Sequence, residues 1–301
     1  MSPHSHLIIH VDYSRIRVNA ERIAQESGVP LIAVVKANAY GLGASRVAAA
    51  IGDLVRGFYV FDAEEAVRYN LHTITGKESI AMLGASNDAA DYVSHHIRPA
   101  VWTLERAALL RDARPVLSVD SGQRRFGCPL SDAADILRRA GITEALTHAV
   151  TVEQARAFDA ATTSAEVFRH AAGTVLIGQT ECRFDAVRPG LGLYVGATRV
   201  SARLIEVHSG AGPAGYTGFV TPNHGVIRGG YSNGLRPGVC RVNGGRRRVI
   251  EVGMQSAFVE LDAADRVGDE VVLLGDDLTE AEVAAAWRCT PQEVLARLIK
   301  A

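Results

Sequence analysis

Short apolar segments alternate with amphipathic segments through the first two thirds of the chain. Residues 31–36 (LIAVVK) precede a segment with helical periodicity at 44–54, and residues 57–62 (GFYVFD) precede another at 63–71. Further apolar segments follow at 80–83, 99–102, 115–120 and 145–150. This alternation predicts parallel strands joined by crossover helices. We expect a (β/α)8 TIM-like barrel, although an open doubly wound sheet has the same periodicity.

The pattern changes after about residue 197, where strand-like segments and turns predominate. One helix is expected at 279–287, with Thr279 as its N-cap. The VNGG turn predicts a hairpin, and the arginines at 246–248 that follow it are expected on a solvated strand edge. The expected strands lie at 201–209, 216–220, 225–234, 238–253, 256–262 and 269–275. We therefore expect a barrel domain at residues 8–197 and a C-terminal mostly β domain at 198–301.

Composition and charge narrow the functional classes. Hydrophobic residues make up 48% of the 301 residues and charged residues 22%, as in ordinary globular proteins. Lysine and arginine total 32 against 33 for aspartate and glutamate, so no net charge favours nucleic acid or anionic lipid. The four cysteines form no C-x-x-C pair, and no apolar run is long enough to span a membrane. We expect a cytoplasmic protein without metal or disulfides that acts on a small molecule.

Lys36 stands directly after an apolar strand, where a charged side chain is unusual. The carboxyl ends of barrel strands are where active sites are assembled. Partial burial there lowers the pKa of a lysine and makes its neutral amine available as a nucleophile toward an aldehyde. The alternative is a lysine on the barrel rim that is paired with an acidic residue.

The segment VVKANAYGLG around Lys36 closely resembles the cofactor-lysine motif of alanine racemases, which are fold-type III pyridoxal phosphate enzymes. The preceding VDYSRIRVNAERIA is similar to that family's first barrel segment, and scattered matches continue in the same order to about residue 294. The resemblance implies an isomerase, an amino-acid racemase that depends on pyridoxal 5'-phosphate. It also implies a barrel followed by a β domain.

Two catalytic residues are implied by the resemblance. Lys36 matches the lysine that binds the cofactor covalently, and Tyr231, in GGYSNGLRPG, matches the catalytic tyrosine. Ser232 and Asn233 replace the alanine and aspartate that usually follow it. Inversion at Cα needs two bases on opposite faces. In the family the tyrosine enters the active site of the neighbouring subunit, which implies a head-to-tail homodimer with shared sites.

Other residues are assigned to the cofactor by the same resemblance. Tyr40 matches the tyrosine that reaches the phosphate, and His148, in LTHAV, matches an imidazole beside the ring. Arg188, in DAVRPGLGLYVG, matches the arginine that hydrogen-bonds the pyridine nitrogen. His148 and Arg188 are also the expected cationic neighbours that help Tyr231 act as a base. The remaining implied cofactor-binding residues are Thr174, Gly190 and Leu191.

Substrate binding is where the sequence departs from the family. Arg125, in SVDSGQRRFG, and Met254, in VGMQS, match positions that contact the substrate carboxylate. Ser118 replaces a lysine that is often carbamylated, which leaves Arg125 without its usual anionic partner. Further departures occur at Leu42, Gly173, Gln255 and Gln292. We expect changed specificity, with alanine or another small or polar amino acid as substrate.

Other functions remain open at this point. A protein of this barrel type can bind pyridoxal phosphate without turnover, as a cofactor-homeostasis protein or an inert interaction subunit. A fold-type III decarboxylase is a further alternative, but such enzymes pair the pyridine nitrogen with a carboxylate, which Arg188 argues against.

Overall fold

The computed structural model describes residues 7–210 and 212–299 and divides into two compact units. The first, called the barrel unit here, contains residues 16–39 and 43–193. The second, called the β unit, contains residues 7–15 and 40–42 and the described residues from 194 onward. The domain boundaries expected from the sequence, 8–197 and 198–301, stay a prediction. The N-terminal strand, β1 (Ile8–Val11), pairs with a strand of the β unit.

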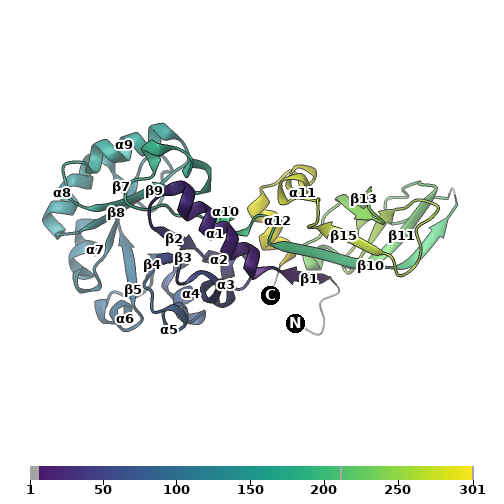
Figure 1. Cartoon of the computed structure of the whole chain (residues 1–301), viewed down its shortest axis with the longest axis horizontal. Coiled ribbons are helices and arrows are strands. Elements are labelled where there is room, and N and C mark those ends of the chain that lie inside the picture. The colour runs from purple at the N-terminus through teal and green to yellow at the C-terminus, as the bar shows by residue number, and fades with distance from the viewer. Residues whose placement is uncertain (1–6, 211, 300–301) are drawn as a thin grey trace. The chain divides into compact units, whose positions relative to one another are not determined.

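Parallel strands surrounded by helices form the barrel unit (Figure 1). Their order is β2-β3-β4-β5-β6-β8-β9, and residues 186–187 close the ring through parallel bridges to β9 and β2. The closure confirms the expected (β/α)8 TIM-like barrel, and the open doubly wound alternative is wrong. The strands are β2 (Leu31–Val34), β3 (Val55–Asp62), β4 (Ser79–Leu83), β5 (Ile97–Val101), β6 (Val116–Asp120), the short β7 (Cys128–Pro129), β8 (Glu144–Ala149) and β9 (Phe168–Ala172).

Helices cover the outside of this ring, and several begin at side-chain caps. Asp62, Asp88, Thr103 and Thr151 each accept a backbone N–H in the first turn of the helix that follows. The helices are α1 (Tyr13–Ser27), α2 (Lys36–Tyr40), α3 (Ala44–Ile51), α4 (Ala63–Arg68), α5 (Leu71–Thr75), α6 (Ala89–Ser94), α7 (Leu104–Leu109), α8 (Leu130–Ala140), α9 (Val152–Thr162) and α10 (Leu191–Tyr194).

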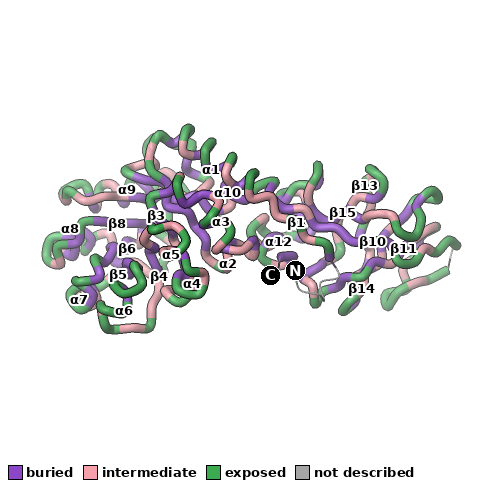
Figure 2. The backbone as a smooth tube through the Cα atoms, turned by 60° about the horizontal axis from the view of Figure 1, so that its bottom comes forward, coloured by how far each residue is buried: buried purple, intermediate pink, exposed green. Residues whose placement is uncertain are grey.

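The interior of the barrel explains its apolar strands. All four residues of β2 and all five of β5 are buried, as expected for parallel strands covered on both faces (Figure 2). A cluster of buried side chains fills the ring, and aromatic side chains pack against it. The buried members are Ile32, Ile80, Met82, Ala100, Val116, Leu146 and Ala186. The interior is therefore a packed core, and polar side chains at the strand ends are available for chemistry.

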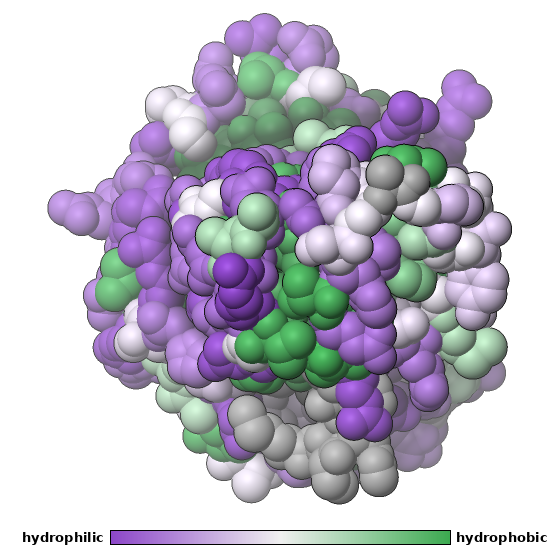
Figure 3. Space-filling view, turned by 90° about the vertical axis from the view of Figure 1, so that its right-hand side faces the viewer, coloured by the Kyte–Doolittle hydropathy of each residue, from purple (hydrophilic) through white to green (hydrophobic). Residues whose placement is uncertain are grey.

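Six antiparallel strands close into a second, smaller barrel in the β unit. Their order is β10-β11-β14-β13-β12-β15, with β15 pairing back to β10 and β1 lying beside β10. Figure 3 views the end of this barrel near β11, where hydrophobic side chains gather between hydrophilic ones. The elements are β10 (Thr198–Ser209), β11 (Asn223–Arg228), β12 (Gly238–Val242), β13 (Gly245–Val252), β14 (Ser256–Glu260), β15 (Glu270–Leu274), α11 (Glu280–Trp287) and α12 (Pro291–Leu298).

Three expectations for this part of the chain are wrong. Residues 216–220 form a turn and not a strand, because Gly215 and Gly218 take positive φ and bend the backbone. A second helix, α12, follows α11, with Thr290 as its N-cap and proline at its first position. Residues 229–234, expected as the end of a strand, are not part of β11 and contain a short 3-10 helix at Tyr231–Asn233, because Gly229 and Gly234 take positive φ.

Three other expectations are confirmed. The arginines at 246–248 form a solvated strand edge, because they pair only with β12, whereas the pairing of β13 with β14 begins at Val249, and Arg246 and Arg248 are exposed. Thr279 caps α11 by accepting the Glu282 N–H at 3.2 Å, and the VNGG turn joins β12 to β13 as a hairpin. Within the described residues no helix has both the length and the apolar character needed to cross a bilayer.

Candidate active site

Lys36 follows the buried strand β2, after Val35, at the carboxyl end of the barrel. The next four residues, from Ala37 to Tyr40, have φ between 53° and 58° and form a left-handed turn. Each non-glycine residue in this conformation costs about 1–2 kcal/mol. Strain of this kind persists only where the surrounding structure imposes it, and it is often found at functional sites.

Two side chains hold the left-handed turn. Glu65, in α4, accepts the Ala37 N–H with Oε1 at 2.7 Å and the Phe61 N–H with Oε2 at 3.0 Å. Asn38 Oδ1 accepts the N–H of Ala44, at the start of α3, at 2.9 Å. The backbone beside Lys36 is thus tied to β3 and to the helix that follows the turn.

The surroundings of Lys36 favour its neutral amine. The side chain is half-buried, and this burial lowers its pKa from the usual 10.5, as the sequence predicted. The charges of Arg125 and Arg188 lower the pKa further, whereas the charge of Glu65 raises it. No ion pair of Lys36 occurs among the described residues. This argues against a rim lysine paired with an acid.

His148 lies near the end of β8, on the same side of the barrel. The side chain is exposed to solvent on one side, but neighbouring atoms displace water from the rest of the ring and lower its pKa to about 4, and the charges of Arg188, Lys36 and Arg125 add to the effect. The imidazole is therefore neutral at pH 7. The sequence predicted a cationic His148 that helps Tyr231 act as a base, and the expected charge is wrong.

Arg125 lies in the loop after β6. Asp120 shapes this loop by accepting the N–H groups of Gly122 and Arg124 with Oδ1, at 2.8 and 3.0 Å. The Arg125 side chain is exposed, and within residues 7–210 and 212–299 it makes no ion pair. Ser118 is buried inside β6 and supplies no charge. An unpaired cation near Lys36 and Arg188 favours an anionic ligand.

Arg188 is buried just beyond the segment that closes the ring, with 4% of its surface exposed. Its Nη1 donates to the His170 carbonyl at 2.6 Å and lies 2.5 Å from His170 Nδ1. Its Nη2 donates to the Thr147 carbonyl. The guanidinium carbon lies 5.6 Å from the centre of the Tyr59 ring. Arg188 is thus fixed by neutral acceptors, and no ion pair in the described part of the chain includes it, which argues against a rim salt bridge.

Thr174 organises the glycine-rich turn that begins α10. Its Oγ1 accepts the N–H groups of Gly190 and Gly192 at 3.2 and 3.1 Å. A Cβ at Gly192 would lie 3.0 Å from the Thr174 methyl group, so a larger residue there would require Thr174 to shift. The Gly190 N–H, which the sequence assigned to a phosphate, is therefore hydrogen-bonded within the chain. Leu191 is the first residue of α10.

Three of the expected site residues belong to the β unit. Burial raises the pKa of Tyr40 to about 12, and its ring centre lies 5.0 Å from that of Tyr194. Tyr231 and Met254 are 57% and 61% exposed. Their turns are joined, because the Tyr231 N–H donates to Gly253 at 2.9 Å and the Ser232 N–H donates to Met254 at 3.1 Å. Two large side chains are thus presented on one exposed corner.

The structure gathers most of the expected residues at one end of the barrel. The carboxyl ends of its strands carry Lys36, Arg125, His148, Thr174, Arg188, Gly190 and Leu191. Sequence reasoning did not find the roles of Glu65, Glu144 and Arg98. The available indication was a charged residue inside an apolar strand, as in EALTHA and IRPAV. A buried charge needs a partner, but the sequence does not identify it.

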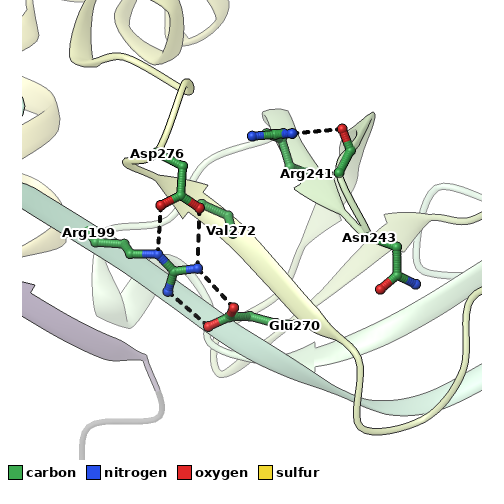
Figure 4. Close-up of a pocket in the computed structure, with 7 residues that line it drawn as sticks. Arg199, Arg241, Asn243, Glu270, Val272 and Asp276 are labelled. Atoms are coloured by element: carbon green, nitrogen blue, oxygen red, sulfur yellow. Dashed lines mark hydrogen bonds and ion pairs between the residues drawn. The ribbon is translucent and has the colours of Figure 1, made fainter.

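A separate hollow in the β unit is lined by charged side chains (Figure 4). Arg199 pairs there with Glu270 at 2.8 Å and with Asp276 at 3.1 Å. Because these charges satisfy one another, we assign no ligand to this hollow. The described part of the chain contains no cluster of histidine, cysteine, aspartate or glutamate suited to a metal ion.

Comparison with known sequences gives one consistent result. Residues 11–198 match the family model described as alanine racemase, N-terminal domain. An alanine racemase of Neisseria meningitidis serogroup C is 30% identical over 346 aligned residues, which cover 98% of this chain and 97% of the relative. An alanine racemase of Shewanella woodyi is 28% identical and covers 95% of this chain and 92% of its own length. The first alignment spans 346 positions and this chain has 301 residues, so the chain lacks segments that the Neisseria protein contains.

Solved structures agree on the fold. Alanine racemase from Bartonella henselae, solved with covalently bound pyridoxal phosphate, has a TM-score of 0.86 at 24% identity, covering 98% of this chain and 97% of that one. Alanine racemase from Acinetobacter baumannii has a TM-score of 0.87 at 19% identity and covers 97% of both chains. The likeness extends over both the barrel unit and the β unit.

Proposed function

Because the chain belongs to the alanine racemase family, we propose that it is an amino-acid racemase that depends on pyridoxal 5'-phosphate. The main support for the proposal is the lowered pKa of the Lys36 amine, which lies at the carboxyl end of β2 near Arg125 and Arg188. A neutral amine suits attachment of an aldehyde, and the surrounding positive charge suits a phosphate and a carboxylate. The bound cofactor supplies the electron withdrawal that weakens the Cα–H bond of an amino acid.

Different residues at the barrel end would hold different parts of the cofactor. Lys36 would hold it covalently, His148 would lie beside its ring as a neutral imidazole, and Arg188 would donate a hydrogen bond to the ring nitrogen. An arginine cannot readily give up its proton, so the ring nitrogen stays unprotonated. This favours racemisation over the decarboxylase alternative. The phosphate would be held by Tyr40, Thr174 and Leu191, beside Gly190, whose own N–H is bonded to Thr174.

Two side chains would move the α-proton. The Lys36 Nζ serves one face of the α-carbon, and the phenol of Tyr231 of the partner subunit serves the other. The exposure of Tyr231 and Met254 supports a head-to-tail homodimer, because a second copy would cover these side chains. Arg125 and the Met254 N–H would bind the substrate carboxylate.

The substrate we propose is alanine or another small or polar amino acid, as the names of the relatives suggest. Ser118 replaces the often carbamylated lysine of the family, so Arg125 lacks its usual anionic partner. This supports a substrate pocket that differs from that of the relatives. A cytoplasmic enzyme that needs no metal, membrane or nucleic acid fits the composition.

Exchange of the α-proton in deuterated water tests this function. We expect the purified protein to show a visible absorption band that Lys36→Ala removes, and to exchange and invert the α-proton of L- and D-alanine or of another member of an amino-acid panel. Tyr231→Phe should keep the band and abolish exchange from one enantiomer. Equal residual rates from both enantiomers would contradict a two-base mechanism. A band without any exchange would favour a cofactor-binding protein without turnover.

A further inference from the structure

A chain of buried polar side chains extends from Arg188 into the barrel wall. His170, Glu144 and Arg98 are 0%, 2% and 8% exposed. His170 Nε2 lies 3.0 Å from Glu144 Oε1, and Arg98 Nη1 donates to Glu144 Oε2 at 2.6 Å. The Arg98 Nε also donates to the Arg114 carbonyl at 3.0 Å. The chain thus joins β5, β8 and β9 to the segment that closes the ring.

Donor and acceptor rules fix the position of the His170 proton. A guanidinium can only donate, so the Arg188 Nη1 that lies 2.5 Å from His170 Nδ1 needs a lone pair there. A neutral imidazole then carries its proton on Nε2, where Glu144 Oε1 accepts it. Burial lowers the pKa of His170 to about 4. Burial alone would raise the pKa of Glu144, but its bonds to His170 and Arg98 hold it at about 2. At neutral pH the imidazole is neutral and the carboxylate is ionised.

The other tautomer is incompatible with the position of Arg188. A proton on His170 Nδ1 would face the Nη1 hydrogens, and two donors would then meet at hydrogen-bond distance. Arg188 would have to move, although Nη1 also donates to the His170 carbonyl and Nη2 to the Thr147 carbonyl. The direction in which Arg188 points therefore depends on which nitrogen of His170 is protonated.

We propose that Glu144 is a positioning residue that keeps His170 in the Nε2–H tautomer and thereby fixes Arg188 as a hydrogen-bond donor at the active end of the barrel. The link from Arg188 to the cofactor rests on the proposed function, whereas the link from Glu144 to Arg188 does not. Arg98 supports Glu144 by pairing with the carboxylate oxygen that His170 leaves free. The other cation near this carboxylate is Arg56, at 3.8 Å, which stacks on Phe168 with its guanidinium 4.1 Å from the ring centre.

Nitrogen NMR of the imidazoles tests this role on the protein without cofactor. Histidine labelled with ¹⁵N gives signals that His170→Gln assigns. In the wild type we expect Nδ1 to have the shift of an unprotonated nitrogen, and the Nε2 proton to be deshielded and slow to exchange, as in a hydrogen bond to a carboxylate. A proton on Nδ1, a doubly protonated ring at pH 7, or a rapidly exchanging Nε2 proton would overturn the proposal, whether or not any variant folds.

Glu144→Gln tests the role of the carboxylate directly. A glutamine can accept from a protonated Nε2 or donate to an unprotonated Nε2, so we expect the single tautomer to become a mixture and kcat to fall about tenfold with little change in KM. The matched control is Glu78→Gln, which removes the same charge from an exposed ion pair with Arg114 and should leave both measurements unchanged. A folded Glu144→Gln protein with the wild-type imidazole signals would overturn the proposal. If the wild type shows no racemisation, the proposed function fails, but the NMR result still decides the role of Glu144.

Discussion

Glu65 both holds the turn beside Lys36 and contributes the charge that raises the pKa of Lys36. Glu65→Gln keeps the size of the side chain and removes its charge. One carboxylate oxygen becomes an NH₂ group, which meets the N–H of Ala37 or Phe61 and cannot accept it. We therefore expect a less stable protein in which the Lys36 pKa is lower than in the wild type.

The size of the effect follows from the two hydrogen bonds. A bond from a backbone N–H to a carboxylate contributes about 1.5–3 kcal/mol. Because Glu65 is half-buried, the lower end applies, and losing one of the two bonds should reduce the free energy of unfolding by about 1.5 kcal/mol. Removing the negative charge of Glu65 lowers the Lys36 pKa further, in addition to the lowering that burial causes.

Two measurements check this prediction. Urea unfolding gives the stability, with Glu64→Gln as control, since Glu64 is an exposed glutamate of the same helix. Labelling lysine with ¹³C gives few signals, because the chain contains only Lys36, Lys77 and Lys300. Their titration gives the Lys36 pKa after assignment by Lys36→Arg. A Glu65→Gln protein with wild-type stability and an unchanged or raised Lys36 pKa would refute the reasoning.

Three further predictions concern the turn, the glycine segment and pH. Ala37→Val should lower the free energy of unfolding by about 2 kcal/mol, because a β-branched residue is poorly accommodated at φ 53°, whereas Ala37→Gly should be tolerated; equal thermal stability would contradict a strained turn. Thr174→Val removes the acceptor for the Gly190 and Gly192 N–H groups, so urea unfolding should show a loss of about 1–3 kcal/mol that Thr174→Ser restores. The folded pKa of His170, about 4, is below the ordinary 6.5, so the unfolded chain takes up the proton first as pH falls. Stability should therefore decline between about pH 6.5 and 4, by up to about 3 kcal/mol from this residue, and His170→Gln should lose that part of the pH dependence in urea titrations.

The sequence predicts the parts of this protein that depend on local pattern. The alternation of apolar strands and amphipathic helices predicted the barrel, and the position of Lys36 directly after β2 predicted its lowered pKa. The same reasoning failed at residues 216–220, where aromatic and β-branched residues have strand propensity but neighbouring glycines bend the chain. It also missed α12, although Thr290 and Pro291 are a recognisable helix start.

Other features depend on contacts that the sequence does not reveal. The segment from Ala37 to Tyr40 contains no glycine, so nothing local predicts its left-handed turn, which Glu65 holds from another helix. The bonds that join Arg188, His170 and Glu144 link β8 and β9 to the segment that closes the ring, and they form only because the ring closes. Tertiary structure decides these features, and it also decides that His148 is neutral.

Reductive trapping of the cofactor tests the central claim most directly. Pyridoxal phosphate is added to the purified protein, the adduct is reduced with borohydride, and its peptides are mapped by mass spectrometry. With three lysines in the chain, the label can fall on few side chains. We predict stoichiometric label on the peptide that contains Lys36. Label on Lys77 or Lys300 alone, or none at all, would contradict the assignment of Lys36 as the cofactor lysine.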